Sequence, residues 1–574
     1  MKKLLLFFIC LSLFLQGPLF AQRGKWVQYE IRGEVLKKES LSFSDSMEIV
    51  QFKKELFKNL HQLGYLNPKL TQEELGKDSL FLFVNTGEKF EWVSLSSGNV
   101  EPVFLVKAGV DLKQISGKPF NFAEVARIFD NLLKSSENQG YPFASIGLDS
   151  VRRTDSKFYA SLNLDLGPLI KFDSLNITGK SKTKREFLAR FLQIRPGDAF
   201  SQKKVNDGIR QIRNLPYLRW AGEPELSFQN EEATLYLPLD DRRVNSIDGI
   251  IGFLPNELEG GRMLVTGQFD LALYNVAGKG RNYELHWQRF NQFSQNLNIS
   301  ALEPLLFGSG IDLKASFSLL KEDTTFLTRD FRLDFGYRIG SGSYLRFFSR
   351  RQAGDLLAVS GLSEAVELPE VGDFRFNNYG LGFEHSWLDD RFFPRRGAIA
   401  GFEFALGNKN ILVNTAIPPN LYSNIDLNTL QYYIMGKVEK HFYKNQKWGL
   451  MSRVAAGFLD NPNLFVNDLF RLGGLRTIRG FNENFFFANN YIYLNLEPRY
   501  YFDTYSYFMI FADMGRLENQ VQKLPTDYPY ALGAGFSLET GSGIFNFVYA
   551  LGGSNAQDFA LNVSKIHFGY TGRF

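Results

Sequence analysis

The chain has 574 residues, a formal net charge of +4 and 15% aromatic residues, including 56 Phe and 25 Tyr, together with 51 Gly. So small a net charge for this length argues against nucleic acid as a partner. After residue 22 no stretch approaches ~18 consecutive apolar residues, which excludes membrane-spanning helices. Aromatic and glycine-rich alternating segments without such helices are typical of a transmembrane β-barrel, although a large secreted β-sandwich or propeller has a similar composition.

The N-terminus predicts a secretory signal peptide over residues 1–21. Two lysines precede an apolar run over residues 4–15, and the small residue Ala21 follows. Charged, apolar and small residues in this order mark a signal that is cleaved. The single cysteine, Cys10, lies inside this segment, and the bulky Ile9 before it does not suit a lipid-attachment signal. The mature chain is therefore expected to lack disulfides and to rely on a core or a closed sheet.

One pattern occurs three times in the first half, and each copy predicts a small α+β domain. A helix with apolar residues at helical spacing leads to a tyrosine, and the tyrosines are evenly spaced at Tyr65, Tyr141 and Tyr217. Two strand-like runs follow the helix, at residues 79–85 and 90–95 in the first copy and at 159–166 and 170–177 in the second. The copies are assigned to residues 22–92, 93–168 and 169–243.

Domains of this size offer sheet edges that can pair with extended peptides. This is the first indication of a function in handling polypeptides, and a passive spacer arm is the alternative. Gly98 and Gly179 close the second run of each pair, and Asn121 has the position of a helix N-cap.

Residues 244–574 lose the helical period and predict a closed sheet. Alternating segments are separated by glycine-rich turns, and at ~10 residues a strand this region holds roughly sixteen strands. The chain ends inside a strand whose aromatic and aliphatic residues share one face, and glycines interrupt the other positions: Ile566, Phe568, Gly569, Tyr570, Gly572 and Phe574. A final strand with a lipid-facing apolar row closes a barrel, and its glycines would weaken the seam with the first strand.

A glycine-rich segment at residues 472–484 carries an arginine, Arg479, between two later strands that carry Glu497 and Asp513. A charge inside a barrel needs a partner, and the planar guanidinium suits carboxylates. We therefore expect Arg479 to bridge Glu497 and Asp513 in the lumen and to anchor an internal loop.

These residues resemble the outer-membrane assembly-factor superfamily, which combines POTRA domains with a bacterial surface antigen barrel. The resemblance rests on the loop motif Ile478, Arg479, Gly480 and Phe481 and on the strand motif from Phe511 through Asp513 to Gly515. The three repeats look like POTRA domains, and residues 390–397 resemble a strand opening common in this barrel. The resemblance implies an all-β barrel of about 16 strands behind three periplasmic POTRA-like domains.

The resemblance further implies insertion or translocation of polypeptides at the bacterial outer membrane. Three repeats favour the TamA-like translocation and assembly module over BamA-type insertases, which carry more repeats. The implied partners are unfolded outer-membrane or secreted polypeptides, the lipid bilayer and an inner-membrane-anchored, periplasm-spanning protein. Two alternatives stay open, a dedicated two-partner-type secretion transporter and a passive diffusion channel. The first repeat departs most from the pattern, and if it is not a POTRA domain the secretion transporter is favoured.

Other motifs do not indicate catalysis, and neither a cofactor nor a metal is expected. Gly179, Lys180 and Ser181 imitate the end of a phosphate-binding loop, but the first glycine of that motif is missing, so we expect a turn. No Gly-x-Ser-x-Gly occurs, and the five histidines show no metal-ligand spacing. Asp389 and Asp390, taken as strand neighbours, would point to opposite faces and could not share a substrate.

Overall fold

The computed structural model describes residues 25–32, 37–43, 46–75, 79–115, 117–118, 120–155, 157–256, 262–289, 293–340, 342–391 and 393–574. The predicted signal peptide, residues 1–21, lies outside the described residues. The chain forms two compact units, one of Met1–Lys171 with Ala199–Gln202 and the other of Phe172–Asp198 with Lys203–Phe574. None of the helices in the described ranges is long and apolar enough to cross a membrane.

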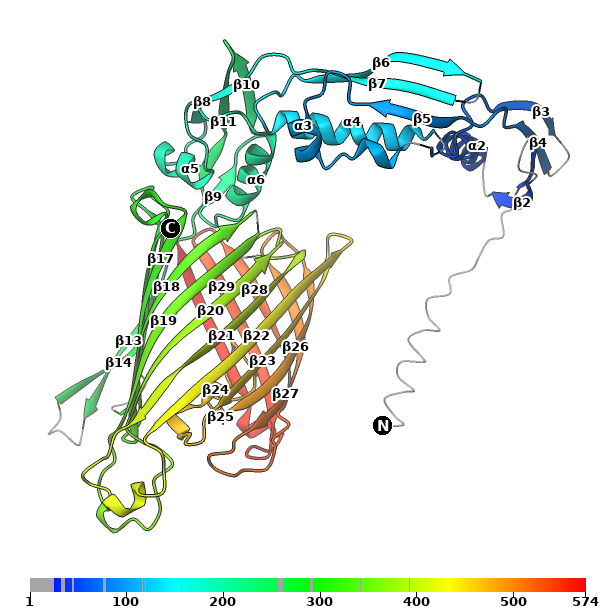
Figure 1. Ribbon diagram of the computed structural model, residues 1–574. Coiled ribbons are helices and arrows are strands. Elements are labelled where there is room, and N and C mark those ends of the chain that lie inside the picture. The colour runs from blue at the N-terminus through cyan, green and yellow to red at the C-terminus, as the bar shows by residue number, and fades with distance from the viewer. Residues whose placement is uncertain are drawn as a thin grey trace. The chain divides into compact units, whose positions relative to one another are not determined.

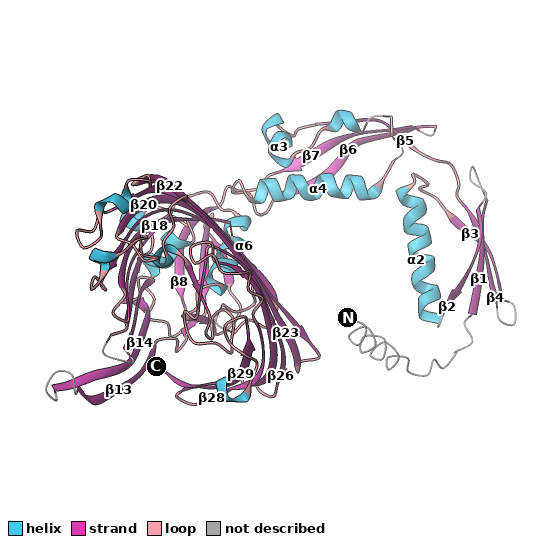
Figure 2. Cartoon of the chain, turned by 90° about the horizontal axis from the view of Figure 1, so that it is seen from below, coloured by secondary structure: helices cyan, strands magenta, loops and turns pink. Residues whose placement is uncertain are grey.

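The first repeat is a four-stranded sheet covered by one helix (Figures 1 and 2). Its sheet has the order β2-β1-β4-β3, with β1 parallel to β4. The helix buries Leu56 and Leu60 against Leu82 and Val84 of the sheet, which holds its apolar face out of water. The elements are β1 (Lys25–Arg32), β2 (Lys37–Phe43), α2 (Ser46–Gln62), β3 (Lys69–Leu75) and β4 (Ser79–Asn85).

The second repeat has two helices on one face of a three-stranded sheet. The sheet order is β5-β7-β6, with β5 parallel to β7. Asn121 caps α4, because its Oδ1 accepts a hydrogen bond of 2.8 Å from the Ala123 amide. Ile128 and Leu132 of α4 are buried in one core with Trp92. The elements are β5 (Glu91–Ser96), α3 (Pro102–Ala108), a 3-10 turn (Leu112–Gln114), α4 (Phe122–Glu137), β6 (Ser145–Thr154) and β7 (Lys157–Asp165).

The third repeat has the same order of a strand, two helices and a hairpin. Its main sheet has the order β10-β11-β8, and β9 pairs with β12 in a two-stranded sheet beside it. Leu188, Val205 and Ile212 of the two helices are buried. The elements are β8 (Lys171–Ile177), α5 (Arg185–Phe191), α6 (Gln202–Arg213), β9 (Leu218–Trp220), β10 (Glu225–Gln229), β11 (Glu232–Leu237) and β12 (Leu239–Asp241).

The second strand-like run of each pair opens the next repeat instead of closing its own. The runs at residues 90–95 and 170–177 were assigned to the ends of the first and second copies. In the structure they are β5 and β8, and β5 pairs with β7 of the second repeat, so we move the proposed boundary at residue 92 ahead of Glu91. The first repeat also departs in kind, since β2 stands where the other two repeats have a short helix.

Two glycines end the first strands of the second and third repeats for the same steric reason. A Cβ at Gly98 would lie 1.8 Å from the Leu162 carbonyl oxygen, and one at Gly179 would lie 2.0 Å from that of Leu239. Only glycine allows the backbones to approach so closely. The spacing of these two glycines is therefore a packing requirement of the repeat.

The second half is a closed barrel of sixteen antiparallel strands, which confirms the predicted fold (Figure 1). Neighbours in the chain are neighbours in the sheet, from β13 round to β30, except that an internal hairpin of two short strands intervenes between β23 and β26. The strands are β13 (Ser246–Asn256), β14 (Arg262–Val276), β15 (Arg281–Arg289), β16 (Gln295–Glu303), β17 (Ile311–Glu322), β18 (Phe326–Ile339), β19 (Ser343–Leu356), β20 (Phe374–Ser386), β21 (Gly397–Ile411), β22 (Asn428–Lys444), β23 (Trp448–Asp460), β26 (Asn490–Tyr501), β27 (Tyr507–Glu518), β28 (Tyr530–Thr540), β29 (Gly543–Gly553) and β30 (Lys565–Arg573).

The barrel strands alternate between an apolar outer face and a polar lumen. On β20, Tyr379, Leu381 and Phe383 are exposed on the outside, whereas Asn378 is buried inside. On β30, Ile566 and Phe568 are 64% and 71% exposed, as the sequence pattern of the last strand predicted. An exposed apolar surface of this kind is suited to lipid.

Candidate functional site

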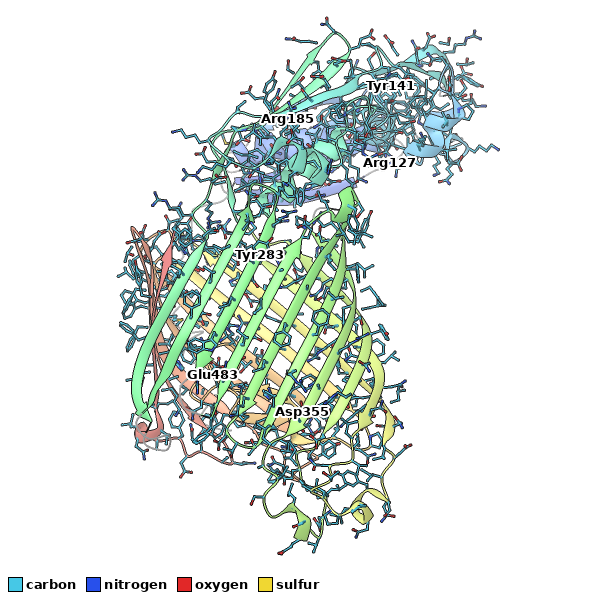
Figure 3. All side chains as sticks on the ribbon, turned by 90° about the vertical axis from the view of Figure 1, so that its left-hand side faces the viewer. Arg127, Tyr141, Arg185, Tyr283, Asp355 and Glu483 are labelled. Carbon is cyan, nitrogen blue, oxygen red and sulfur yellow. The ribbon has the colours of Figure 1, made fainter. Side chains whose placement is uncertain are left out.

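The candidate site has two parts, an internal loop inside the barrel and the seam between its first and last strands. The loop is held by a small hairpin, β24 (Phe470–Leu472) paired with β25 (Phe486–Ala488), which lies toward the end of the barrel away from the third repeat (Figure 1). Figure 3 labels Glu483, on this loop, whose carboxylate accepts a hydrogen bond of 3.1 Å from the Leu475 amide. This bond closes the loop on itself.

The structure places Arg479 against both carboxylates that the sequence analysis proposed. Its Nε and Nη2 donate to Asp513 at 2.8 and 2.7 Å, and its Nη1 donates to Glu497 at 2.6 Å. The backbone amide of Arg479 also donates to Asp513, and the guanidinium lies 3.6 Å from the centre of the Phe511 ring. Asp513 is fully buried, so this charge is compensated almost entirely by one arginine.

The residues around Arg479 pack the loop closely against the barrel wall. Ile478 and Phe481 are completely buried. Gly480 has a φ of +85°, and a Cβ there would lie 2.7 Å from the Gly552 amide nitrogen on β29. The loop backbone thus rests directly on the wall next to the last strand, which only glycine permits.

Two parts of this environment were not found from the sequence. Arg499 donates to the second oxygen of Glu497 at 2.7 Å, so Glu497 bridges two arginines. Arg499 and Glu497 are two apart on β26 and so share its lumenal face, a signal that could have identified the pair. Lys409 and Asp468 form a fully buried ion pair across 59 residues of chain, and no sequence pattern links them.

The Lys409 pair fastens the segment that leads into the internal loop. Its ammonium group also donates to the Asn463 carbonyl at 2.7 Å and lies 4.6 Å from the centre of the Phe465 ring. Phe465 belongs to an apolar cluster, with Phe374 and Ile417, formed where the long connections after β19, β21 and β23 meet. These connections cover the end of the barrel away from the third repeat.

The lumen is crossed by further arginine and carboxylate pairs. Arg332 on β18 donates to Asp334 at 2.7 Å and to Glu403 on β21 at 2.9 Å. Arg453 on β23 donates to Glu439 on β22 at 2.8 Å. Across the residues that the structure describes, no three His, Cys, Asp or Glu side chains gather closely enough to hold a metal ion.

The seam between β13 and β30 is the weakest junction in the barrel wall. Their register has two residue pairs, Ser246 with Arg573 and Ile247 with Gly572, both at the end nearest the third repeat. β13 and β14 share eleven register pairs. Figures 1 and 2 show the β13–β14 hairpin leaving the barrel wall at its far end, which separates β13 from the described length of β30.

The third repeat docks on the barrel through the turn that imitates a phosphate-binding loop. Asp240 accepts a hydrogen bond of 2.9 Å from the Lys180 amide, which holds the pKa of its carboxyl below the ordinary value of 3.8. The Lys184 amide then donates to the Gly278 carbonyl at 2.8 Å, in the turn between β14 and β15. The segment is a docking turn, in agreement with the expectation of a turn.

Asp389 and Asp390 lie in the turn between β20 and β21 and not on a strand, so the expectation of opposite faces does not apply. Asp389 accepts hydrogen bonds from the amides of Asp390 and Arg395, and Asp390 accepts one of 2.9 Å from the Phe393 amide. The two carboxylates shape a turn.

Comparison with known proteins gives two family matches. The model of the Omp85 superfamily domain matches residues 275–574, and that of the surface antigen variable number repeat, a POTRA model, matches residues 170–239. The outer membrane protein assembly factor BamA of Neisseria meningitidis serogroup B is 20% identical over 449 residues, which are 72% of this chain and 53% of that protein. The chain thus spans about half the length of this curated relative.

Solved structures of CdiB show a similar fold. CdiB from Escherichia coli has a TM-score of 0.56 at 14% identity, over 92% of this chain and 98% of that one. CdiB from Acinetobacter baumannii has a TM-score of 0.55 at 13% identity, with the same coverage of 92% and 98%. At this identity the likeness concerns the fold alone.

Proposed function

The chain belongs to the Omp85 superfamily, and on that premise we propose that it inserts or translocates polypeptides at the outer membrane. The barrel lies in the outer membrane and the POTRA domains lie in the periplasm. The connection that carries Asp468, the partner of Lys409, is therefore on the extracellular side. We propose that periplasmic repeats receive client chains and that the barrel seam aids their insertion.

The two-pair register between β13 and β30 is the observation that carries this proposal. A closed barrel leaves no strand edge in the bilayer, because unpaired amide and carbonyl groups are costly in lipid. Because β13 and β30 are paired at one end only, few hydrogen bonds must break before a strand edge is free. A client strand could then pair with that edge and satisfy its own backbone in the membrane.

The contents of the lumen favour a function at the barrel wall over a function as an open pore. The internal loop, with Ile478 and Phe481 fully buried, occupies the lumen beside β29, and arginine pairs cross it elsewhere. The anchored loop would give the wall next to the last strand a fixed shape. We assign Arg479 this structural role in the proposed function.

The repeats offer edges on which extended clients could pair. In the first repeat the outer strands are β2 and β3, in the second β5 and β6, and in the third β10 is an outer strand. β6 is exposed along most of its length. Addition of a client strand to such an edge supplies backbone hydrogen bonds without a fixed sequence.

A dedicated secretion transporter is the second candidate, and the first repeat is what favours it. Among the elements that the structure describes, the order of a strand, two helices and a hairpin occurs in the second and third repeats and not in the first. The POTRA model matches the third repeat. Two typical repeats before the barrel, with one divergent domain ahead of them, would suit recognition of a single client.

Depletion of the protein in its native host, followed by quantification of the outer-membrane proteome, tests the proposal. Loss of a broad set of barrel proteins is expected for an assembly factor. Loss of one secreted protein with the barrels intact would replace it with the dedicated transporter. Crosslinking from the first repeat in the same cells would recover the inner-membrane-anchored partner that a TamA-like role requires, and recovery of none would remove that role.

A further inference from the structure

The turn between β20 and β21 reaches across the periplasmic opening of the barrel. Its described residues are 387–391 and 393–396. Arg395 donates to the Tyr443 hydroxyl on β22 at 3.0 Å and to the Asp503 carbonyl, beyond the end of β26, at 3.1 Å. Its guanidinium lies 4.8 Å from the centre of the Tyr501 ring. The turn is thereby fixed to β22, the neighbour of β21, and to the end of β26, which lies three strands from β21 in the barrel wall.

The tip of this turn contacts the linker that leads into the first barrel strand. Arg242 follows β12, and its Nη1 donates to Asp390 at 2.6 Å. The two side chains are 20% and 26% exposed, so the ion pair is largely shielded from water. The Arg242 guanidinium also lies 5.7 Å from the Phe393 ring and 5.8 Å from the Tyr505 ring.

The same tip contacts the last barrel strand. The guanidinium of Arg573, on β30, lies 4.4 Å from the centre of the Phe393 ring. Phe393 in turn packs edge-on against Tyr505, with centroids 4.8 Å apart. Arg242 and Arg573 therefore approach one aromatic ring from the two sides of the seam, although β20 and β21 stand in the middle of the strand order.

We propose that Asp390 and Phe393 form a clamp with Arg242, Arg573 and Tyr505 that keeps the periplasmic end of the seam closed at rest. The clamp deepens the proposed function, because it acts on the same seam. Two arginines beside each other repel, and the Asp390 carboxylate with the two rings offsets that repulsion. Without the clamp, the short pairing between β13 and β30 would alone oppose the repulsion between Arg242 and Arg573.

Asp390 has two separable roles in the clamp. One oxygen, Oδ1, accepts the Phe393 amide and positions the ring, while the other, Oδ2, pairs with Arg242. Asp390→Asn keeps an oxygen for the turn and removes the charge. The variant therefore tests the ion pair without dismantling the turn.

Hydrogen exchange at the end of β30 measures the clamp in the purified full chain in lipid nanodiscs, with no client present. The Phe574 amide donates to the Asn245 carbonyl across the seam, so it exchanges only when the periplasmic end opens. We expect Asp390→Asn and Phe393→Leu each to speed exchange of the Phe574 amide about fivefold, as loss of one shielded ion pair or ring contact implies.

Matched variants make the result specific. Arg391→Gln removes a charge from the same turn whose partner is Glu384 on β20, and it should leave exchange of the Phe574 amide unchanged. The double variant Arg242→Gln with Asp390→Asn should exchange no faster than either single variant, because both substitutions remove the same ion pair.

Equal exchange in Asp390→Asn and Arg391→Gln would overturn the clamp, and so would acceleration spread evenly over the barrel strands. Since no client takes part, these outcomes do not depend on whether the protein inserts or secretes polypeptides.

Discussion

At the residue scale, the buried carboxylates around Arg479 make that side chain the most sensitive position in the lumen. Arg479→Ala would leave the fully buried Asp513 without its bidentate partner, while Glu497 would keep Arg499. We expect a loss of about 3–5 kcal/mol in the free energy of unfolding, the usual cost of one unpaired buried charge. Urea titration of the folded barrel in detergent, followed by tryptophan fluorescence, measures it.

Arg516→Ala is the control, because Arg516 stands on the same strand as Asp513 but pairs with Glu518 at the surface, where its side chain is 53% exposed. Its removal should change the free energy of unfolding by about 0–1 kcal/mol. If both alanine variants unfold at the same urea concentration, Arg479 does not anchor the loop.

The Lys409–Asp468 pair gives a second residue-scale prediction, on the extracellular side. Lys409→Met leaves the buried Asp468 charge unpaired, so the segment after β23 should detach and become open to protease. Adding Asp468→Asn removes that charge, and protection should return toward the wild-type value. Limited proteolysis of intact cells measures it, and persistent cleavage in the double variant would contradict the role given to the pair.

At the element scale, helices and strands with a local hydrophobic period could be predicted from the sequence. Strand pairings that depend on distant contacts could not. The helix before each repeat's tyrosine, the strand count and the apolar row of β30 followed from helical spacing, length and alternation, whereas the short helices α3 and α5 were not predicted. The runs that form β5 and β8 were grouped with the preceding repeat, because these strands pair with strands that come more than 50 residues later. The Arg479 partners could be proposed from the charges alone, whereas the β13–β30 register could not.

The docking turn of the third repeat should respond to acid. Because the Lys180 amide lowers the pKa of Asp240 below 3.8, the carboxylate stabilises the turn at pH values above 3.8. That stabilisation is lost as the pH falls through the lowered pKa. The protection factor of the Lys180 amide in hydrogen exchange should therefore be constant above this value and fall below it. Asp240→Asn should remove the pH dependence, and a dependence that survives in this variant would assign it to another group.

At the scale of the whole molecule, the barrel differs from a diffusion channel in two features. Its lumen is occupied, and its seam is weak. We expect low steady conductance in planar bilayers, because the internal loop and the Arg332 pairs obstruct the lumen. Arg479→Ala should raise the conductance by releasing the loop. High steady conductance of the wild-type protein would instead favour the passive channel.

The central claim is that clients use the seam, and a disulfide across it tests this directly. Ile247→Cys with Gly572→Cys joins two register partners, and a second pair, Asn546→Cys with Gly569→Cys, joins β29 to β30 as the control. In depleted cells complemented with the oxidised seam pair, we predict loss of the client proteins from the outer membrane and their recovery on reduction. The control pair should support normal levels in both states. Normal client levels with a fully oxidised seam would contradict the account.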